Sequence, residues 1–300
     1  MSLSPRTATR IQRGEGERAG HFFICLFLGL FAFTTIYPVW HVIMYSLSDS
    51  KQAMSGGFFF WPRGFSLLSY EMVFKTSQIW IAYRNSILVM AVGTVISVLL
   101  SAVTAYPLSR KRLRGRNFFS MVIFFTMLFS GGMIPLYLQV SRLGLLNTFW
   151  SMILPISMSA YNMFILRNFM QGIPYEIEEA ASIDGASHVK KLFAIIAPLS
   201  LPSIATITLF CAVDYWNSYF NALIYIDDKN TAVLQIYLRE LLMSIQQAEM
   251  NGIVDELANN NANDAIRGAA VFACTIPIIL VYPFLQKYYV KGVTLGAVKG

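Results

Sequence analysis

Residues 83–107 read YRNSILVMAVGTVISVLLSAVTAYP, and this run decides the fold class. Its length is close to the roughly 20 apolar residues that cross a bilayer as a helix. In hydrocarbon, every backbone polar group needs a partner inside the protein, and a helix supplies those partners within the segment itself. The run therefore predicts a membrane-spanning helix.

Five further apolar runs predict an all-helical polytopic membrane protein with six transmembrane helices. They lie at about 22–45, 118–138, 149–166, 203–225 and 268–286. The composition agrees, because 56% of the residues are hydrophobic and 13% are charged, whereas soluble domains carry about 25% charged residues. The net charge of +7 comes from Lys and Arg residues gathered in particular loops. We therefore expect membrane lipid, and no nucleic acid, as a partner.

The charge of the loops predicts how the spans are oriented. The 108–117 loop carries five basic residues, whereas the short 139–148 loop carries only Arg142. Cytoplasmic loops carry such an excess of Lys and Arg. The 108–117 loop is therefore expected inside, and alternation places the two long loops, at about 46–82 and 226–267, outside.

The same alternation places both termini on the cytoplasmic side of the cytoplasmic membrane. Residues 1–21 are basic and precede the first span, so they predict a cytoplasmic N-terminal segment. No small-residue cleavage site follows the first apolar core, and we therefore expect no removed signal peptide. Residues 22–300 then form one transmembrane domain.

The sequence contains no motif for catalysis, ATP binding or metal binding. It has no Gly-x-x-x-x-Gly-Lys-Ser/Thr loop and no Gly-x-Ser-x-Gly nucleophile motif. Its three His and three Cys residues lack the spacing of metal ligands. We therefore expect that the chain is not an enzyme and binds no cofactor or metal.

An acidic, polar stretch interrupts the apolar runs at 174–202, on the predicted cytoplasmic side. Glu178 and Glu179 fall near the start of a predicted helix, where its positive end favours carboxylates. Gly185 permits a sharp turn, and Asp184 is expected to cap the next helix. The pattern predicts two short helices joined by one turn, with carboxylates exposed to a partner protein.

This stretch resembles the EAA motif of permease subunits of ABC importers, specifically the carbohydrate family related to the maltose-type permeases. The matching residues are Glu179-Ala180-Ala181, Gly185, Ile195 and Pro198, with Ala197 where Leu is usual. The tail at 292–300 looks like a branch associated with complex oligosaccharides. The resemblance implies a type I ABC importer permease fold, with 174–202 as the coupling loop.

The resemblance also implies a set of partners. The coupling loop would sit on a cytoplasmic ABC ATPase dimer, which would bind the ATP and Mg that this chain does not bind. A second homologous permease would complete a heterodimer, and an extracytoplasmic solute-binding protein would deliver a sugar or oligosaccharide for import by alternating access. The implied ATPase-docking residues are Glu178, Glu179, Ala180, Ala181, Asp184, Gly185 and Ala186.

Polar and aromatic residues near the end of the fifth predicted span are candidates for the substrate path. A carboxylate at membrane depth is costly and usually faces a cavity or a partner. Aromatic rings interleaved with amides suit the apolar faces and hydroxyl edges of sugars, although an interfacial aromatic belt would have a similar composition. The candidates are Asp214, Tyr215, Trp216, Asn217, Tyr219 and Asn221.

Two other functions stay open from the sequence. A permease of the same architecture would carry a non-sugar solute, such as phosphate or peptides. A proton-coupled secondary transporter would use Asp214 as its proton site and would act without an ATPase. The secondary transporter leaves the EAA pattern unexplained.

Overall fold

The computed structural model describes residues 15–49, 52, 57–250 and 263–280. Within this part, three helices are each long and apolar enough to cross a membrane. They are α1 (Glu15–Ser46), α4 (Ser77–Ser109) and the helix Asn263–Leu280. Three bent helix pairs pass the same test, so these residues supply up to six spans. The predicted all-helical polytopic architecture is confirmed.

Two of the predicted spans contain a sharp bend, and a third bend lies just before the fifth predicted span. The predicted span 118–138 is wrong as a single helix, because α5 (Arg116–Leu128) and α6 (Met133–Arg142) meet at 110°. Gly132 precedes α6 with a φ of +89°, a backbone conformation that glycine adopts readily. The second pair joins α7 (Phe149–Ile153) and its 3-10 extension η1 (Leu154–Ile156) to α8 (Ala160–Gln171), at 52°.

The third bend lies between the acidic loop and the fifth predicted span. The helical stretch His188–Leu199 meets α12 (Leu201–Trp216) at 87°. The stretch consists of α10 (His188–Lys191), a π-helical turn η2 (Leu192–Ile196) and α11 (Ala197–Leu199). The predicted span 203–225 is likewise interrupted after Trp216, and a separate helix α13 (Tyr219–Tyr225) follows.

The chain divides into two compact units, of which the smaller is Met1–Ser69 with Asp255–Ala269. In this unit, Phe59 is buried against the end of α1 beside Met44. The Trp40 indole N–H donates a hydrogen bond to the carbonyl of Phe60 at 3.0 Å. The apolar segment after α1 therefore packs on α1 through part of its length, while its other aromatic residues stay exposed.

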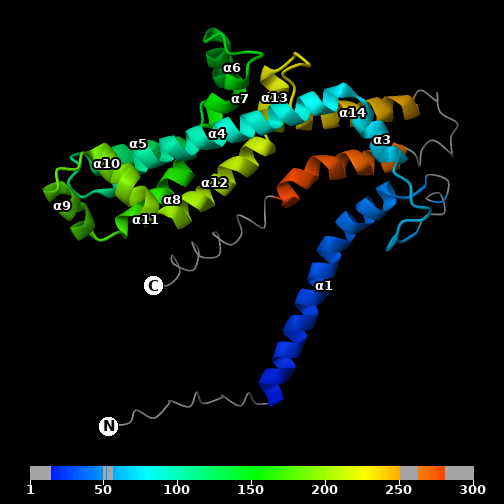
Figure 1. The fold of residues 1–300 in the computed structure, drawn as a ribbon, viewed down its shortest axis with the longest axis horizontal. Helices are drawn as coiled ribbons and strands as arrows, with labels where there is room; N and C mark the ends of the chain where they lie inside the picture. The colour runs from blue at the N-terminus through cyan, green and yellow to red at the C-terminus, as the bar shows by residue number, and fades with distance from the viewer. Residues whose placement is uncertain (1–14, 50–51, 53–56, 251–262, 281–300) are drawn as a thin grey trace. The chain divides into compact units, whose positions relative to one another are not determined.

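The larger unit is Tyr70–Val254 with Ala270–Gly300, and α4 is its central helix. α12 and α8 pack along α4 (Figure 1). Two core clusters form on this helix. One joins Val89 to residues of α7 and α12, and the other joins Ala105 to residues of α8 and α12. These contacts make α4 the element on which the rest of the unit is assembled.

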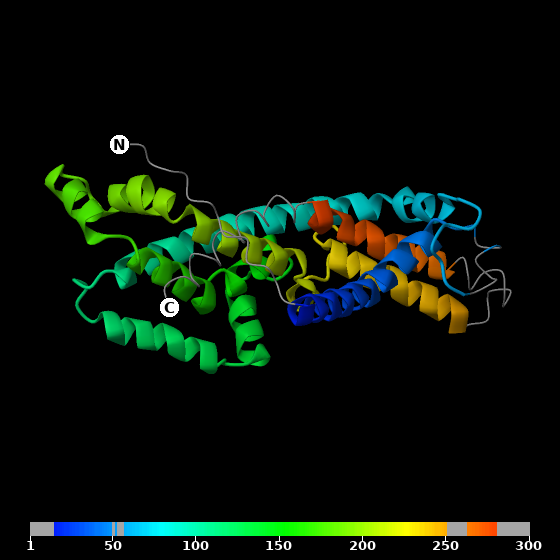
Figure 2. The same ribbon diagram turned by 90° about the horizontal axis from the view of Figure 1, so that it is seen from below.

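The remaining helices of the larger unit lie at the two ends of α4. Figures 1 and 2 show α9 (Tyr175–Ile183) at one end and α14 (Leu234–Met250) at the other. The short helix α3 (Leu68–Lys75) precedes α4 at the same end as α14. One long helix therefore reaches from the acidic loop to the predicted outer loop.

A close approach between α4 and α12 depends on Gly93. A β-carbon built at Gly93 would lie 2.5 Å from the ring of Tyr215, so only glycine leaves room for that ring. The Tyr215 hydroxyl donates to the carbonyl of Ile153 at 3.1 Å and lies 2.9 Å from the Ser97 hydroxyl. One buried tyrosine thus ties α4, α7 and α12 together.

Replacing Gly93 with alanine should destabilise the larger unit. The added methyl group overpacks the Tyr215 contact, and overpacking typically costs about 1–3 kcal/mol of unfolding free energy. The measurement is the thermal unfolding midpoint of the purified protein in mild detergent.

Gly29→Ala is the matched control, because Gly29 lies in α1 with no atom within 4 Å of a built β-carbon. Alanine is the better helix former, so this variant should unfold at or above the wild-type midpoint. Equal midpoints for the two variants would contradict the packing argument.

Candidate functional site

The acidic loop folds into two short helices joined by one left-handed residue. α9 ends at Ile183 with Asp184 as its C-cap, and Gly185 follows with a φ of +74°, where glycine is favoured. α10 begins after Ser187, whose hydroxyl accepts a hydrogen bond from the backbone N–H of Lys190 at 3.3 Å. The predicted pair of helices is present. The prediction that Asp184 caps the second helix is wrong, because Ser187 occupies that position.

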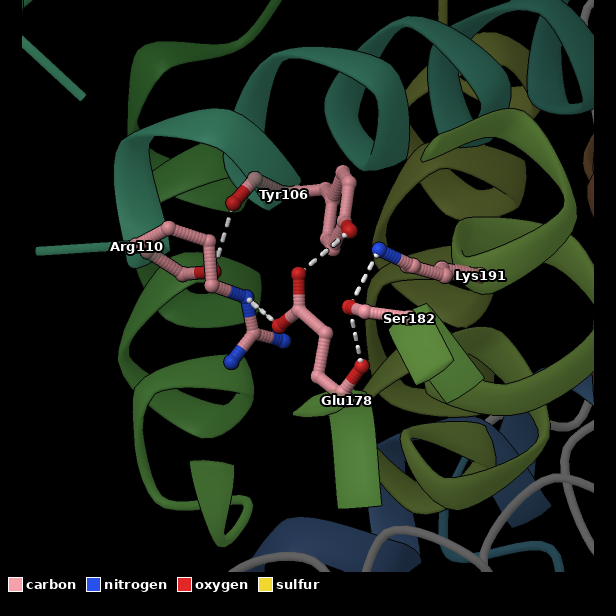
Figure 3. Close-up of polar contacts among 6 residues, drawn as sticks. Tyr106, Arg110, Glu178, Ser182 and Lys191 are labelled. Carbon is pink, nitrogen blue, oxygen red and sulfur yellow. Dashed lines mark hydrogen bonds and ion pairs between the residues drawn. The ribbon is translucent and has the colours of Figure 1, made fainter. Parts of the chain in front are cut away.

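The first feature of the loop is a buried carboxylate on α9. Glu178 is 6% exposed, and its carboxylate accepts a hydrogen bond of 2.7 Å from the hydroxyl of Tyr106 (Figure 3). Its other oxygen lies 2.8 Å from Nε of Arg110, an ion pair that lacks the alignment of a hydrogen bond. The Arg110 guanidinium also lies 5.2 Å from the centre of the Tyr106 ring. We call these three residues the Glu178 cluster; it joins α9 to the end of α4.

A second buried charge ties α9 to the helix that follows it. The Lys191 ammonium donates to the Ser182 hydroxyl at 2.7 Å, and that hydroxyl donates to the backbone carbonyl of Glu178 at 2.8 Å (Figure 3). Lys191 is 7% exposed. Buried polar and charged groups are costly unless they find such partners, so these contacts hold the two helices of the loop together.

The opposite side of α9 is exposed. Glu179 and Ala180 are exposed, as are Asp184 and Gly185 at the turn. Ile183, in the last turn of α9, is 82% exposed. These residues form a surface that this chain leaves uncovered, which we call the outer face of the loop.

Three of the expected docking residues do not lie fully on the outer face. Glu178 and Ala181 are buried within the chain, and Ala186 is half-buried. Consecutive residues of a helix are separated by a rotation of about 100°, since 3.6 residues make one turn. Adjacent carboxylates of one motif therefore point in different directions.

The candidate substrate residues are also divided between core and surface. Tyr215 and Trp216 are 4% and 3% exposed and belong to the packing of α12. Asp214 and Asn217 are exposed. Tyr219 and Asn221 are half-buried. Four of the six candidates are therefore at least partly accessible, whereas Tyr215 and Trp216 belong to the core.

A polar pair at the other end of α4 had no role assigned from the sequence. Asn85 is fully buried, and its amide donates to the carbonyls of Asn230 and Ala232 at 2.8 and 2.9 Å. The Ser86 hydroxyl accepts from the backbone N–H of Leu234 at 2.8 Å, at the start of α14. In the sequence, the sign of this attachment was a pair of adjacent polar residues at the start of an apolar run.

A comparison with known families identifies the chain. The family described as "Binding-protein-dependent transport system inner membrane component" matches residues 97–295, which is most of the sequence. The chain belongs to this family. It is a membrane-embedded permease subunit of an ABC importer, and the ATP-hydrolysing subunit of such a transporter is a separate protein.

Individual relatives match nearly the whole permease. The polygalacturonan/rhamnogalacturonan transport system permease protein YtcP of Bacillus subtilis (strain 168) is 43% identical over 276 residues, covering 91% of this chain and 96% of that protein. Protein LplC of the same organism is 40% identical over 290 residues, covering 95% and 98%.

A solved structure matches the fold of the permease. It is a chain of a bacterial ABC transporter involved in the import of the acidic polysaccharide alginate, with a TM-score of 0.83 and 31% identity. The match covers 92% of this permease and 99% of that chain. The predicted ABC importer permease fold and the resemblance to the carbohydrate permeases are confirmed.

Replacing Tyr106 with phenylalanine should loosen α9. The change removes the hydrogen bond to a charged carboxylate, which is worth about 1.5–3 kcal/mol. The amides of 175–183 should then exchange with deuterium faster in the purified permease. Tyr161→Phe is the control, because Tyr161 is 57% exposed. Unchanged exchange in the Tyr106 variant would show that the hydroxyl does not hold α9.

Proposed function

We propose that this permease imports an oligosaccharide across the cytoplasmic membrane. An extracytoplasmic binding protein delivers the sugar, and a cytoplasmic ABC ATPase dimer drives its passage. The observation that carries the proposal is the outer face of the coupling loop, an exposed carboxylate beside a small residue and a left-handed turn, on a chain of this family. ATP and Mg bind to the ATPase and not to this chain.

The coupling loop docks on the ATPase through its outer face. Glu179 supplies a charge that a basic residue of the ATPase pairs, and Ala180 permits close approach of the two backbones. Gly185 forms the turn between the helices, with Asp184 beside it. Ala186 lies at the edge of this contact. Glu178 and Ala181 support the surface from inside the chain.

A carbohydrate substrate is supported by the relatives. YtcP is named for polygalacturonan and rhamnogalacturonan, and the matching solved transporter is described as importing alginate. Both names refer to polymers that contain uronic acids, so uronate-containing oligosaccharides are the first substrates to test. Asp214 and Asn217, with Tyr219 and Asn221 beside them, are the proposed substrate contacts, whereas Tyr215 and Trp216 hold the scaffold.

The permease works as half of a heterodimer with a second homologous subunit. The side chains of α5 support this arrangement, because none of its residues is buried within the chain. Ile123 is half-buried, whereas eight other large hydrophobic side chains of α5 are exposed to between 45% and 71%: Phe118, Phe119, Met121, Val122, Phe124, Phe125, Met127 and Leu128. Lipid and the second subunit together cover such a surface.

The decisive experiment is purification of the tagged permease from its native membrane in mild detergent. A second permease and an ATPase should co-purify, with vanadate-sensitive ATP hydrolysis. Vesicles that contain the complex and the binding protein should accumulate uronate-containing oligosaccharides only when ATP is supplied on the ATPase side. Recovery of the permease alone, with accumulation driven by a proton gradient, would overturn the proposal.

Glu179→Arg should detach the ATPase while leaving the permease in the membrane, because the reversed charge repels the basic partner. Glu71→Arg is the matched control: it makes the same change in net charge at an exposed position on α3. The measurement is the amount of ATPase that co-purifies per permease. Full recovery of ATPase with the Glu179 variant would exclude this residue from the docking contact.

Both termini lie in the cytoplasm according to the charge of the loops. A cysteine placed in the 108–117 loop and one placed at either end of the chain should be labelled by a membrane-impermeant maleimide only after the cells are opened. A cysteine at 228, in the outer loop, should be labelled in intact cells or spheroplasts. Labelling of a terminus in intact cells would reverse the assigned orientation.

A further inference from the structure

We infer that the Glu178 cluster fixes the coupling loop to α4, so that α4 carries the displacement of the loop to the segment that precedes α14. This inference rests on the proposed function, in which the ATPase moves the loop. Glu178 and Arg110 are positioning residues in this scheme, because neither contacts the ATPase or the substrate. Tyr106 is the third member of the attachment.

The first step of the argument is the strength of the inner attachment. The Glu178 carboxylate has two partners, at 2.7 and 2.8 Å, and both come from the last turn of α4 or the residue that ends it. The carboxylate and the guanidinium are each largely shielded from water, with side-chain exposures of 7% and 13%. Separating opposite charges in such surroundings is costly. A movement of α9 therefore takes the end of α4 with it.

The second step is that two adjacent acidic residues of α9 face in different directions. Glu178 faces into the chain, whereas Glu179 is exposed one residue later. One carboxylate is available to a partner, and the other is occupied inside the permease. The same turn of α9 thus receives force on one side and passes it to α4 on the other.

The third step is the continuity of α4. It is one helix of 33 residues, whereas the three bent helix pairs turn by 52° to 110°. Near its other end, Asn85 and Ser86 attach α4 to the segment before α14. A helix rises 1.5 Å per residue, so this attachment lies about 30 Å from Tyr106. The Asn85 amide donates hydrogen bonds to two carbonyls of the segment before α14, and the Ser86 hydroxyl accepts one from the first N–H of α14. A shift of α4 along its axis therefore reaches the segment 230–234.

The fourth step is the contrast with the covalent route through α12. That route leaves the loop through the π-helical turn Leu192–Ile196 and the 87° bend at Ser200. π-helical turns and sharp bends mark places where a helix departs from its regular hydrogen bonding. The route through α12 can absorb a displacement by flexing. The part of α4 between Tyr106 and Asn85 has no such joint, because Pro107, the proline within α4, lies beyond Tyr106.

The test uses the assembled importer with its ATPase and binding protein. Glu178→Gln keeps the side-chain size and an acceptor for Tyr106 but removes the charge. The ATPase should still co-purify, while the stimulation of ATP hydrolysis by loaded binding protein should fall about tenfold, a typical size for coupling between sites. Glu176→Gln is the control, because Glu176 is an exposed acid on the same helix. Wild-type stimulation in the Glu178 variant would overturn the inference.

A second readout separates transmission from simple loss of structure. Vanadate trapping should change the deuterium exchange of both 175–183 and 230–234 in the wild-type importer. In the Glu178→Gln variant, the change at 175–183 should persist and the change at 230–234 should disappear. Equal changes at both segments in that variant would overturn the inference.

Exchange of the two charges provides the rescue. Glu178→Arg and Arg110→Glu should each abolish stimulation alone and should restore part of it together. Tyr106→Phe supplies a milder variant where the single charge reversals assemble poorly, and it should reduce stimulation without loss of the ATPase. The cluster would be excluded from transmission by two results together: a double variant stimulated no more than the single variants, and a Tyr106→Phe variant stimulated as strongly as the wild type.

These outcomes are distinct from a failure of the proposed function. A wild-type permease that recovers no ATPase refutes the importer itself. A wild-type importer that assembles and responds to the binding protein, with a Glu178 variant that responds equally, refutes only the transmission through α4.

Discussion

The structure depends on one constraint: each backbone N–H and C=O at membrane depth needs a partner from the protein. An unbroken helix such as α4 meets this need within itself along most of its length; the exception is Pro107 in its last turn, because proline has no N–H. Where a span bends, side chains from other helices supply the missing donors. The Tyr215 hydroxyl donates to the carbonyl of Ile153, at the junction of α7 and its 3-10 turn. The ends of helices have the same need, because the last carbonyls of a helix lack partners within it. At the end of α4, Arg167 donates to the carbonyl of Leu108 at 3.0 Å.

The same constraint explains how much could be predicted from the sequence. The length and hydropathy of the apolar runs were sufficient to predict an all-helical polytopic protein, of which the described residues supply up to six spans, because a bilayer of fixed thickness demands apolar segments of that length. The bends were not predicted. The break before α6 depends on the backbone conformation of Gly132, and glycine also occurs within the continuous helix α4. Only the tertiary partners distinguish these two uses of glycine.

The candidate site was predicted as a segment but not as a surface. The EAA pattern located the acidic loop and its turn at Gly185, because residue type and spacing specify them. It did not reveal that Glu178 is internal, since a motif gives the identity of a side chain and not its rotation about the helix. The burial of Tyr215 and Trp216 has the same cause. Aromatic residues suit both a sugar and a helix interface, and Gly93, distant in sequence, decides that Tyr215 is core.

The contact between Gly93 and Tyr215 also restricts how this family member can evolve. A larger residue at 93 requires a smaller one at 215, and the smaller residue forfeits the hydroxyl that serves Ser97 and Ile153. No single replacement at either position preserves both the fit and the hydrogen bonds. Divergent descendants of this chain should therefore either keep both Gly93 and Tyr215 or replace both. Joint variation at positions 93 and 215 would then indicate how closely α4 and α12 approach.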